Sequence, residues 1–541
     1  MSCKLRKTLK ASQCLMLFLL MAGVASAIQS PPPNIVFILA DDLGWSDLAG
    51  GQTTHGGGSD FYETPNIARL AREGMAFSSA YACANCAPTR AALISGQYPT
   101  RTRVYNVGNL NRRVGKPKLI GPEQRQDVAP EITTLAETLK SAGYVTAHVG
   151  KYHAGGHEGG AATLPLKQGF DFNYGGTAEG YPGDFFADRK PDGPWRFHAN
   201  VSPELDAFAA PYDADYAAGY RIWNDPGYRL PASLRETPKH VGDAVADAAL
   251  EFMEKHRSAG KPFFLQLNDY LVHTPLQGRP DLVEKFAVRK VSSPSRMGHD
   301  KHAAYAAMVA QLDMTVGRII AYLEDPDGDG DRSDSLAGNT LVVFYSDNGG
   351  ERGSTSNAPL RGAKGMFTEG GIRVPLIAWM PGRIPAGATN DSSVNMVDFH
   401  PTLADFAGAK LPDAARQPLD GVSLRPLLEG RTQTLAPRAL YWHFPGYLDD
   451  RAEPTSMVLR DLDGKRWKLL YFYESRRWSL YNLTDDPGES VDVIAATTAG
   501  PQGKALAVLS DDLHQWLDRT GAIFPIELST GKPVPPPSPA R

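Results

Sequence analysis

Cysteine is scarce in this chain, with four residues among 541, and two of these lie within the first 27 positions. The two that remain, Cys83 and Cys86, are too few for the disulfide framework of a small secreted protein. They are also too few for a zinc site built from two cysteine pairs. The spacing Cys83-Ala-Asn-Cys86 therefore leaves two interpretations, a redox pair or a single reactive cysteine beside an unreactive one.

An excess of charge is also missing, because the formal net charge is −4 at pH 7. A balance this close to zero gives no reason to expect a nucleic-acid partner or an anionic membrane. Beyond the N-terminal region, the sequence has no apolar run long enough to span a bilayer. Its 42% hydrophobic and 21% charged residues are typical of a globular protein, and its length predicts one large domain and a smaller one.

The first 27 residues have the pattern of a secretory signal peptide. Four basic residues precede an apolar run from Leu15 to Val24, and Ala25-Ser-Ala27 supplies the small residues of a cleavage site. The run is too short to anchor the chain comfortably in a membrane. We expect residues 1–27 to be removed after Ala27 and the mature protein to be secreted or periplasmic.

Helices alternate with short buried strands through most of the chain, which predicts an α/β domain over residues 28–430. Its central sheet is expected to be large, mostly parallel or mixed, and flanked by helices. The predicted strands are apolar runs of strand length. They are Asn34–Leu39, Tyr144–Val149, Pro262–Leu267, Thr340–Tyr345 and Val374–Trp379.

The pattern changes after residue 430. Short strands with tight connections, at Met457–Arg460, Trp467–Phe472 and Trp478–Tyr481, precede an amphipathic helix. They predict a small α+β domain with an antiparallel sheet over residues 431–525. The proline-rich segment 526–541 is expected to be a tail with no core to join.

The segment Cys86-Ala-Pro-Thr-Arg90 brings reactive groups together. Pro88 suits the first turn of a helix, and this predicts that Cys86 lies just before a helix N-terminus, where free N–H groups favour anions. Arg90, one turn further on, can reach back to the same place. A nucleophile, an anion hole and a fixed cation then coincide, which a buried structural cysteine would not require.

This segment resembles the signature of type I sulfatases, a family of the alkaline-phosphatase-like superfamily in which the cysteine is oxidised to formylglycine (3-oxoalanine). Other landmarks of the family follow in order along the chain. They are Asp41-Asp42, Gly150-Lys-Tyr-His153, His273-Thr-Pro275, Ser346-Asp-Asn-Gly349, Leu360–Pro375 and Leu480–Glu489. The resemblance implies that the protein hydrolyses a sulfate ester with a nucleophile made from Cys86, and that a formylglycine-generating maturation enzyme is a partner.

Oxygen ligands follow two of the predicted strands, with Asp41 and Asp42 after one and Asp347 and Asn348 after another. Ligands collect at such carboxyl ends of strands. Three carboxylates and an amide suit a hard cation, so calcium is the expected metal and magnesium the alternative. The resemblance adds the residue made from Cys86 to the ligand set.

The remaining catalytic assignments come from the resemblance. Displacement at a sulfate ester spreads negative charge over the sulfuryl and leaving oxygens, and fixed cations are the expected device for stabilising it. Lys151 and Lys364 are expected to hold the sulfate, and Lys364 with His273 to stabilise or protonate the leaving alcohol. His153 is expected to take a proton from the formylglycine hydrate.

The acidic run Asp325–Asp331 imitates a calcium-binding loop, but Leu336 stands where such a loop needs a bidentate glutamate. We interpret it as a solvated turn and leave open whether it binds a second ion.

Two other functions stay open. A phosphodiester or phosphonate monoester hydrolase would share the superfamily, although lysines stand here where a second metal would need carboxylates and imidazoles. A degenerate sulfatase-like binding protein would lack catalytic positions, and all the matched positions are present.

The substrate is expected to be a sulfated carbohydrate rather than a small aryl sulfate, because an aromatic-rich stretch and Trp442-His443 could form a platform for sugar rings. The aromatic residues of that stretch are Tyr181, Phe185, Phe186, Trp195, Tyr212, Tyr216, Tyr220 and Trp223.

Overall fold

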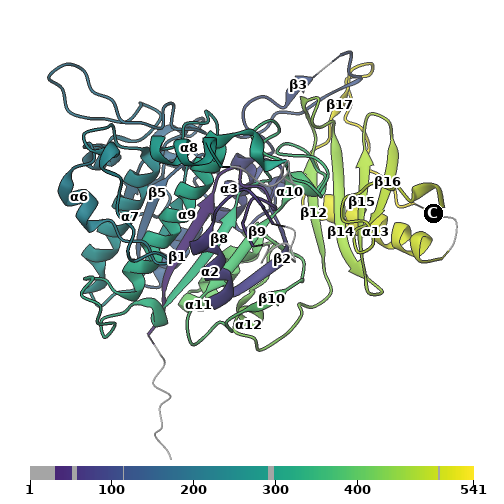
Figure 1. Ribbon diagram of the computed structural model, residues 1–541. Coiled ribbons are helices and arrows are strands. Elements are labelled where there is room, and N and C mark those ends of the chain that lie inside the picture. The colour runs from purple at the N-terminus through teal and green to yellow at the C-terminus, as the bar shows by residue number, and fades with distance from the viewer. Residues whose placement is uncertain (1–30, 51–57, 114, 290–297, 497–499, 541) are drawn as a thin grey trace, which may run out of the picture. The chain divides into compact units, whose positions relative to one another are not determined.

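The computed structural model describes residues 31–50, 58–113, 115–289, 298–496 and 500–540. The predicted signal peptide, residues 1–27, lies outside them. Residues from Pro33 onward form one compact unit. Within the described residues this unit holds a nine-stranded sheet with helices on both faces and a four-stranded sheet formed by later residues (Figure 1).

Most strands of the main sheet run parallel, in the spatial order β10-β2-β9-β8-β1-β7-β5-β6, with β11 beside β2. In sequence order they are β1 (Asn34–Ala40), β2 (Met75–Tyr81), β5 (Val145–Gly150), β6 (Phe172–Tyr174), β7 (Phe263–Asn268), β8 (Thr340–Ser346), β9 (Arg373–Trp379), β10 (Ala388–Asn390) and β11 (Val394–Asn395). β9 runs antiparallel to both of its neighbours, β8 and β2. The predicted large mixed sheet is thereby confirmed.

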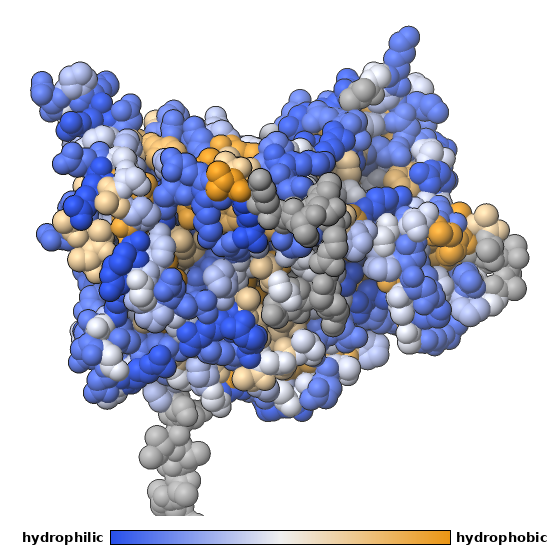
Figure 2. All heavy atoms as spheres, in the orientation of Figure 1, coloured by the Kyte–Doolittle hydropathy of each residue, from blue (hydrophilic) through white to orange (hydrophobic). Residues whose placement is uncertain are grey.

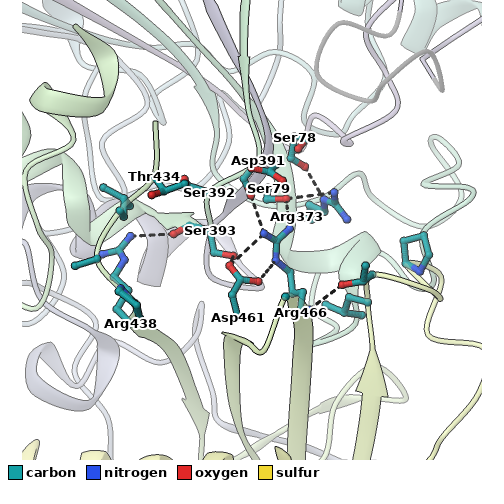
Figure 3. A pocket seen from close by; sticks show the side chains of 17 residues that line it. Ser78, Ser79, Arg373, Asp391, Ser392, Ser393, Thr434, Arg438, Asp461 and Arg466 are labelled. Carbon is teal, nitrogen blue, oxygen red and sulfur yellow. Dashed lines mark hydrogen bonds and ion pairs between the residues drawn. The ribbon is translucent and has the colours of Figure 1, made fainter. Parts of the chain in front are cut away.

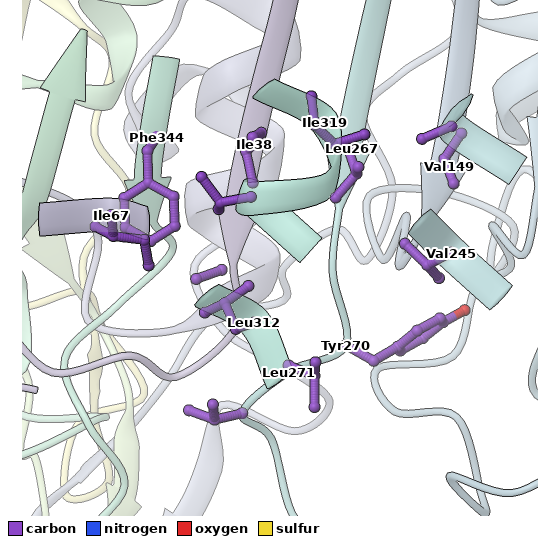
Figure 4. Packing of buried hydrophobic residues seen from close by; sticks show 14 of the residues in the cluster. Ile38, Ile67, Val149, Val245, Leu267, Tyr270, Leu271, Leu312, Ile319 and Phe344 are labelled. Carbon is purple, nitrogen blue, oxygen red and sulfur yellow. The ribbon is translucent and has the colours of Figure 1, made fainter. Parts of the chain in front are cut away.

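Both faces of this sheet are covered, because successive side chains of a strand point to opposite sides. On one face, Ile38 and Phe344 pack beneath α2 (Pro65–Glu73), α7 (Val241–Arg257) and α9 (Ala303–Glu324), with Leu312 and Ile319 of α9 in the same cluster (Figure 4). On the other face, Phe37 joins residues of α3 (Cys86–Ser95), α5 (Leu135–Ser141) and α11 (Phe399–Ala407). The central strands β1 and β8 are therefore apolar along most of their length.

Helix α9 is the most apolar of the long helices that cover the sheet. It has 22 residues, enough to cross a membrane, but 89% of its most apolar window is buried inside the protein. It lies among α2, α7 and α8 (Pro280–Ala287) as a core helix. Its apolar character thus follows from burial in this core.

The small sheet comprises β12 (Ala439–Phe444), β14 (Thr455–Leu462), β15 (Lys465–Phe472) and β16 (Arg477–Asn482), all antiparallel. Helix α13 (Gly500–Arg519) packs against β14 and β15. The predicted antiparallel sheet is confirmed, and β12 is a strand that the sequence analysis did not predict.

Several short elements lie between these. They are β3 (Asn111–Arg113), β4 (Leu119–Ile120), β13 (Tyr447–Asp449), β17 (Ile526–Glu527), α4 (Pro99–Thr102), α6 (Ala214–Gly219), α10 (Glu369–Ile372) and α12 (Arg425–Leu428).

The C-terminal segment packs against the protein, so the expectation that it joins no core is wrong for residues 526–540. β17 pairs with β4, and Val534 is buried beside Leu119, Tyr447 and Tyr473. The prolines that follow β17 lack a backbone N–H and so limit further strand pairing, but the side chains of this segment still fill gaps between strands.

Buried charges join the two sheets. Lys468 of β15 makes ion pairs of 3.0 Å with Glu369 and 2.8 Å with Glu489, and all three side chains are 0% exposed. Tyr81 at the end of β2 also donates a hydrogen bond to Glu369, at 3.0 Å. The small sheet is thus attached to the segment between β8 and β9 that carries Lys364.

A polar hollow of about 540 Å³ lies at the same junction (Figure 3). Arg466 of β15 donates to Asp461 Oδ1 at 2.9 Å, to the carbonyl of Asp391 at 2.7 Å and to the Ser79 hydroxyl of the main sheet. Arg373 donates from Nε to the Ser78 carbonyl at 2.7 Å. The Arg466 guanidinium group therefore joins the two sheets, whereas Arg373 links two neighbouring strands of the main sheet.

Replacing Lys468 by methionine should lower the free energy of unfolding by about 3–5 kcal/mol, because two buried carboxylates would lose their counter-charge. Lys465→Met on the same strand is the matched control. Lys465 pairs with Asp485 at 2.6 Å but is 43% exposed, so its loss should cost less than about 1 kcal/mol. Urea unfolding of both variants tests this, and equal effects would contradict it.

Candidate active site

Four neighbouring parallel strands, β8, β1, β7 and β5, end at the same edge of the sheet. The chemically active side chains lie in the segments that follow these strand ends. Asp41-Asp42 comes after β1, Asp347-Asn348 after β8, Lys151 and His153 after β5, and His273 after β7. The common direction of these strands is what brings distant parts of the sequence together.

Gly150 at the end of β5 allows the strands to approach closely. Its φ is +88°, and a Cβ there would lie 2.0 Å from the Asn268 carbonyl oxygen. That same oxygen accepts a hydrogen bond from the Lys151 N–H at 2.8 Å. A larger residue at position 150 would displace Lys151 from the site.

Cys86 is the first residue of helix α3, which begins two residues earlier than Pro88 suggested. Asn85 caps the helix and accepts from the Cys86 N–H at 3.3 Å. The thiol is 2% exposed, and its Sγ lies 3.4 Å from His153 Nδ1. Burial raises the pKa of the thiol despite the charges of Lys151 and Lys364, so the unmodified side chain is not a ready thiolate nucleophile.

Cys83 lies just before the same helix and is also a buried, free cysteine. Burial raises the pKa of its thiol to about 12. A redox pair needs at least one thiol with a lowered pKa. The environment of both sulfurs therefore weighs against the redox reading.

The predicted oxygen ligands form one buried cluster. The Asp42 N–H donates to Asp347 Oδ1 at 3.1 Å, and Asn348 Nδ2 donates to Asp42 Oδ1 at 2.8 Å. Two buried oxygens in the cluster, Asp41 Oδ1 and Asn348 Oδ1, accept no hydrogen bond from the part of the chain that the structure describes. Burial and the nearby Asp41 carboxylate raise the pKa of Asp347 to about 6. Convergent carboxylates with unsatisfied oxygens fit a hard divalent cation.

Each carboxylate of the cluster also contacts a basic side chain. Lys151 Nζ lies 2.7 Å from Asp41 Oδ2, and Lys364 Nζ lies 2.8 Å from Asp42 Oδ2. Burial works against ionisation of Asp42, but Lys364, His273 and Lys151 outweigh it and hold the pKa of Asp42 well below its usual range. The site therefore combines fixed positive and negative groups with little access to water.

Arg90 contacts the predicted metal ligands. Its Nη2 donates to Asp347 Oδ2 at 2.7 Å, and its Nη1 donates to the Lys151 carbonyl at 2.7 Å. Thr89 Oγ1 also donates to the Asp347 carbonyl at 2.6 Å. Arg90 thus acts as a positioning residue that ties the helix of Cys86 to the strand ends.

His273 lies beside Asp42, with its Nε2 3.7 Å from Asp42 Oδ2. Its Nδ1 is 2.6 Å from the Thr274 carbonyl, so Nδ1 carries the proton in the neutral ring. Burial and the charge of Lys364 lower the pKa of His273 to about 3. Tyr181 stacks against the imidazole at a centroid distance of 6.5 Å.

A cavity of about 590 Å³ opens over Cys86, His153, His273 and Lys364. Its outer wall includes polar and charged residues that sequence reasoning did not identify. They are Arg112, Gln126, His157, Glu179, Glu351 and Arg451. They come from separate loops and short strands with no periodic pattern, so the sequence held no signal for them. On the face that Figure 2 shows, hydrophilic side chains predominate among the described residues.

The expected aromatic platform does not form. Of its aromatic residues, Tyr181 is the one that lines the cavity. Tyr212 and Tyr220 are buried in a separate cluster, and the Trp442 indole donates to the Ala82 carbonyl at 2.8 Å. Packing within the loops and between the sheets accounts for these rings.

Two residues of the acidic run Asp325–Asp331 lie close to an acidic residue just beyond it, because carboxylate oxygens of Asp325, Asp327 and Asp334 lie within 4.8 Å of one another. Asp325 accepts hydrogen bonds from the N–H groups of Gly328 and Gly330 at 2.9 and 3.3 Å. These bonds are those of a turn, as the sequence analysis expected.

Comparison with known proteins gives the family. Residues 33–409 match the Sulfatase family model, and residues 363–515 match the model for the C-terminal region of N-sulphoglucosamine sulphohydrolase. A sulfatase of Formosa agariphila is 40% identical over 93% of this chain and 92% of its own length. The N-acetylgalactosamine-6-sulfatase of Canis lupus familiaris is 33% identical over 79% of this chain and 72% of its own length.

Solved structures with a similar fold are consistent with the sulfatase family. The crystal structure of Ps i-CgsB in complex with k-i-k-neocarrahexaose is 28% identical, with a TM-score of 0.62 over 90% of this chain and 92% of that chain. The PsFucS1 sulfatase from Pseudoalteromonas sp. shares the fold, with a TM-score of 0.63 over 92% of this chain and 93% of that chain. The chain therefore belongs to the sulfatase family and is a sulfuric ester hydrolase.

Proposed function

We propose that the protein removes sulfate from a sulfated carbohydrate, using a formylglycine made from Cys86 and a calcium ion bound by Asp41, Asp42, Asp347 and Asn348. The observation that carries the proposal is the position of Cys86. It begins a helix beside a buried cluster of three carboxylates and one amide, in which two oxygens accept no hydrogen bond from the described residues. Magnesium is the alternative cation, and the residue made from Cys86 is expected to complete the ligand set.

Oxidation at Cys86 supplies what a thiol lacks, because a hydrated aldehyde has one hydroxyl to attack sulfur and a second to help expel sulfate afterwards. His153 supports this chemistry from 3.4 Å away. Burial and the charge of Lys151 keep its pKa well below the usual value. A neutral imidazole in this position can accept a proton from a hydroxyl at residue 86.

Lys364 is favoured over His273 for neutralising the leaving oxygen. Both side chains line the cavity, but Asp42 raises the pKa of Lys364 although burial opposes this, so Lys364 stays protonated. His273 in its neutral form carries its proton on Nδ1, where the Thr274 carbonyl accepts it. Lys151, fully buried against Asp41, is expected to hold the sulfate together with Lys364.

The names of relatives support a carbohydrate substrate. One relative is an N-acetylgalactosamine-6-sulfatase, and one similar solved structure contains k-i-k-neocarrahexaose. The cavity walls supply charged and amide side chains together with Tyr181, a combination that suits a hydroxylated, anionic sugar.

Cleavage of residues 1–27 and export are part of the proposal, and N-terminal sequencing that begins at Ile28 would support them.

Sulfate release from sulfated mono- and oligosaccharides by the purified protein tests the function directly. Phosphodiesters and phosphonate monoesters form the comparison set. A higher kcat/KM on any phosphorus ester than on every sulfate ester would reject the proposed substrate class. Turnover of no ester at all by calcium-loaded protein that contains formylglycine would favour a degenerate binding protein.

Replacing Lys364 by alanine should reduce kcat on a sugar sulfate by about 100-fold or more, but much less on an activated aryl sulfate. A poor leaving group needs its developing charge neutralised, whereas a good one does not. His273→Ala should show the same trend to a smaller extent.

Lys364→Arg, which keeps the charge, is the matched control and should retain more activity on the sugar sulfate than the alanine variant. Thermal unfolding would show whether either variant is misfolded. Equal losses on the two substrates would reject the role of Lys364 at the leaving group.

A further inference from the structure

The cations of the cavity differ in what they contact. Lys364 is bonded to Asp42, and Arg451 pairs with Glu351 through two hydrogen bonds of 2.8 and 2.9 Å. Arg112 also lines the cavity. In the described part of the chain, no carboxylate pairs with Arg112. Its guanidinium group therefore offers all of its donors to a bound molecule.

The backbone that carries Arg112 is fixed to the nucleophile helix and to the small domain. Asn85, the cap of α3, donates from Nδ2 to Asn106 Oδ1 at 2.7 Å. The next turn is closed by Gln126, which exchanges hydrogen bonds of 3.1 Å with Gly108. β3 itself pairs with β13, with Arg112 opposite Leu448. Arg112 is thus held at a defined place relative to Cys86.

The loop at residues 178–181, which forms another part of the wall, has the opposite charge. Glu179 lines the cavity and has no cationic partner in the described residues. A second anionic group on a bound sugar would be repelled there and attracted by Arg112. The cavity wall therefore carries a cation and an anion that are each unpaired in the described residues, and a second anionic group would be held at Arg112 rather than at Glu179.

We propose that Arg112 binds a second oxyanion of the substrate, a sulfate or a carboxylate that is not the one hydrolysed. This inference rests on the proposed function and adds to it that the substrate carries at least two anionic groups. A guanidinium group matches either oxyanion through two parallel hydrogen bonds, which adds orientation as well as attraction.

Arg113 provides a matched control. It is exposed like Arg112 and adjacent on β3, but it does not line the cavity. Successive side chains of a strand point to opposite sides. A general effect of surface charge would appear equally in Arg112→Gln and Arg113→Gln, whereas a binding site would respond to the first alone.

The test compares KM and kcat of wild type, Arg112→Gln and Arg113→Gln on pairs of oligosaccharides that differ only in a second sulfate or in a uronic carboxylate. The preference of wild type for the doubly charged member, taken as the ratio of KM values, should fall about three- to tenfold in Arg112→Gln and stay unchanged in Arg113→Gln. Added salt should weaken the preference in wild type but not in Arg112→Gln.

Calorimetric binding of the same sugars to Cys86→Ala protein, with and without Arg112→Gln, separates this inference from the proposed function. Tighter binding of the doubly charged sugar that depends on Arg112 supports the subsite even if wild type releases no sulfate. In the kinetic test, the subsite is overturned if wild type, Arg112→Gln and Arg113→Gln prefer the doubly charged sugar equally. It is also overturned if the Arg112 and Arg113 variants lose this preference equally, even if sulfate is released. Response to only one of the two oxyanions identifies which is bound.

Discussion

Replacement of Cys86 by alanine should reduce sulfate release by a factor on the order of 10⁵ or more, because the side chain that becomes the nucleophile is gone. The cations around it, Lys151, Lys364 and Arg90, cannot compensate, since they stabilise charge but attack nothing. Hydrolysis of a sulfated sugar by wild type and variant at saturating calcium measures the effect.

Cys83→Ala is the control for this experiment. Cys83 is also buried but lies outside the Cys86-Ala-Pro-Thr-Arg90 segment, and its backbone N–H, which donates to Thr89 Oγ1, is kept in the variant. It should retain most of the wild-type activity. If both cysteines proved equally necessary, the redox reading would regain support and the sulfatase chemistry proposed for Cys86 would be rejected.

Removal of bound metal should reduce activity by about 10³-fold or more, and calcium should restore it, because the ligand set consists of oxygen atoms alone. A divalent cation also neutralises the repulsion among Asp41, Asp42 and Asp347. Calcium should therefore raise the melting temperature of the wild-type protein. Activity and thermal unfolding measured during titration after chelation check both effects.

A pair of variants shows which acidic cluster binds the calcium that activity needs, the one with Asp347 or the one with Asp325. Asp347→Asn should abolish both the restoration of activity and the rise in melting temperature. Asp325→Asn, in the exposed turn, should leave the restoration of activity intact. Restoration by zinc alone, or a calcium response that is lost only with Asp325, would show that the metal site has been misassigned.

The sheet could be predicted because its central strands are buried on both faces and therefore apolar throughout, as β1 and β8 are. β2 was not predicted, since Ser78 and Ser79 interrupt its apolar run although both are buried in the structure. β12 was missed for a different reason, because its Trp442 was interpreted as a sugar platform. Burial of aromatic and polar side chains depends on partners that are distant in sequence.

The strand-end residues of the candidate site could be predicted because parallel strands place their carboxyl ends at one edge. The role of Arg90 could not, since its contact with Asp347 spans 257 positions. Arg112 and Arg451 were invisible for the same reason, because they belong to surface segments that only the folded chain brings to the cavity. What the sequence lacks is the identity of these long-range neighbours.

Mass spectrometry of the peptide that contains Cys86, from fully active wild-type protein, is the most direct measurement. The proposal predicts an aldehyde at position 86 in at least a fraction of the chains and an unmodified thiol at Cys83. It also predicts that the specific activity of different preparations rises in proportion to the aldehyde content. An unmodified or disulfide-linked Cys86 in fully active protein would contradict it.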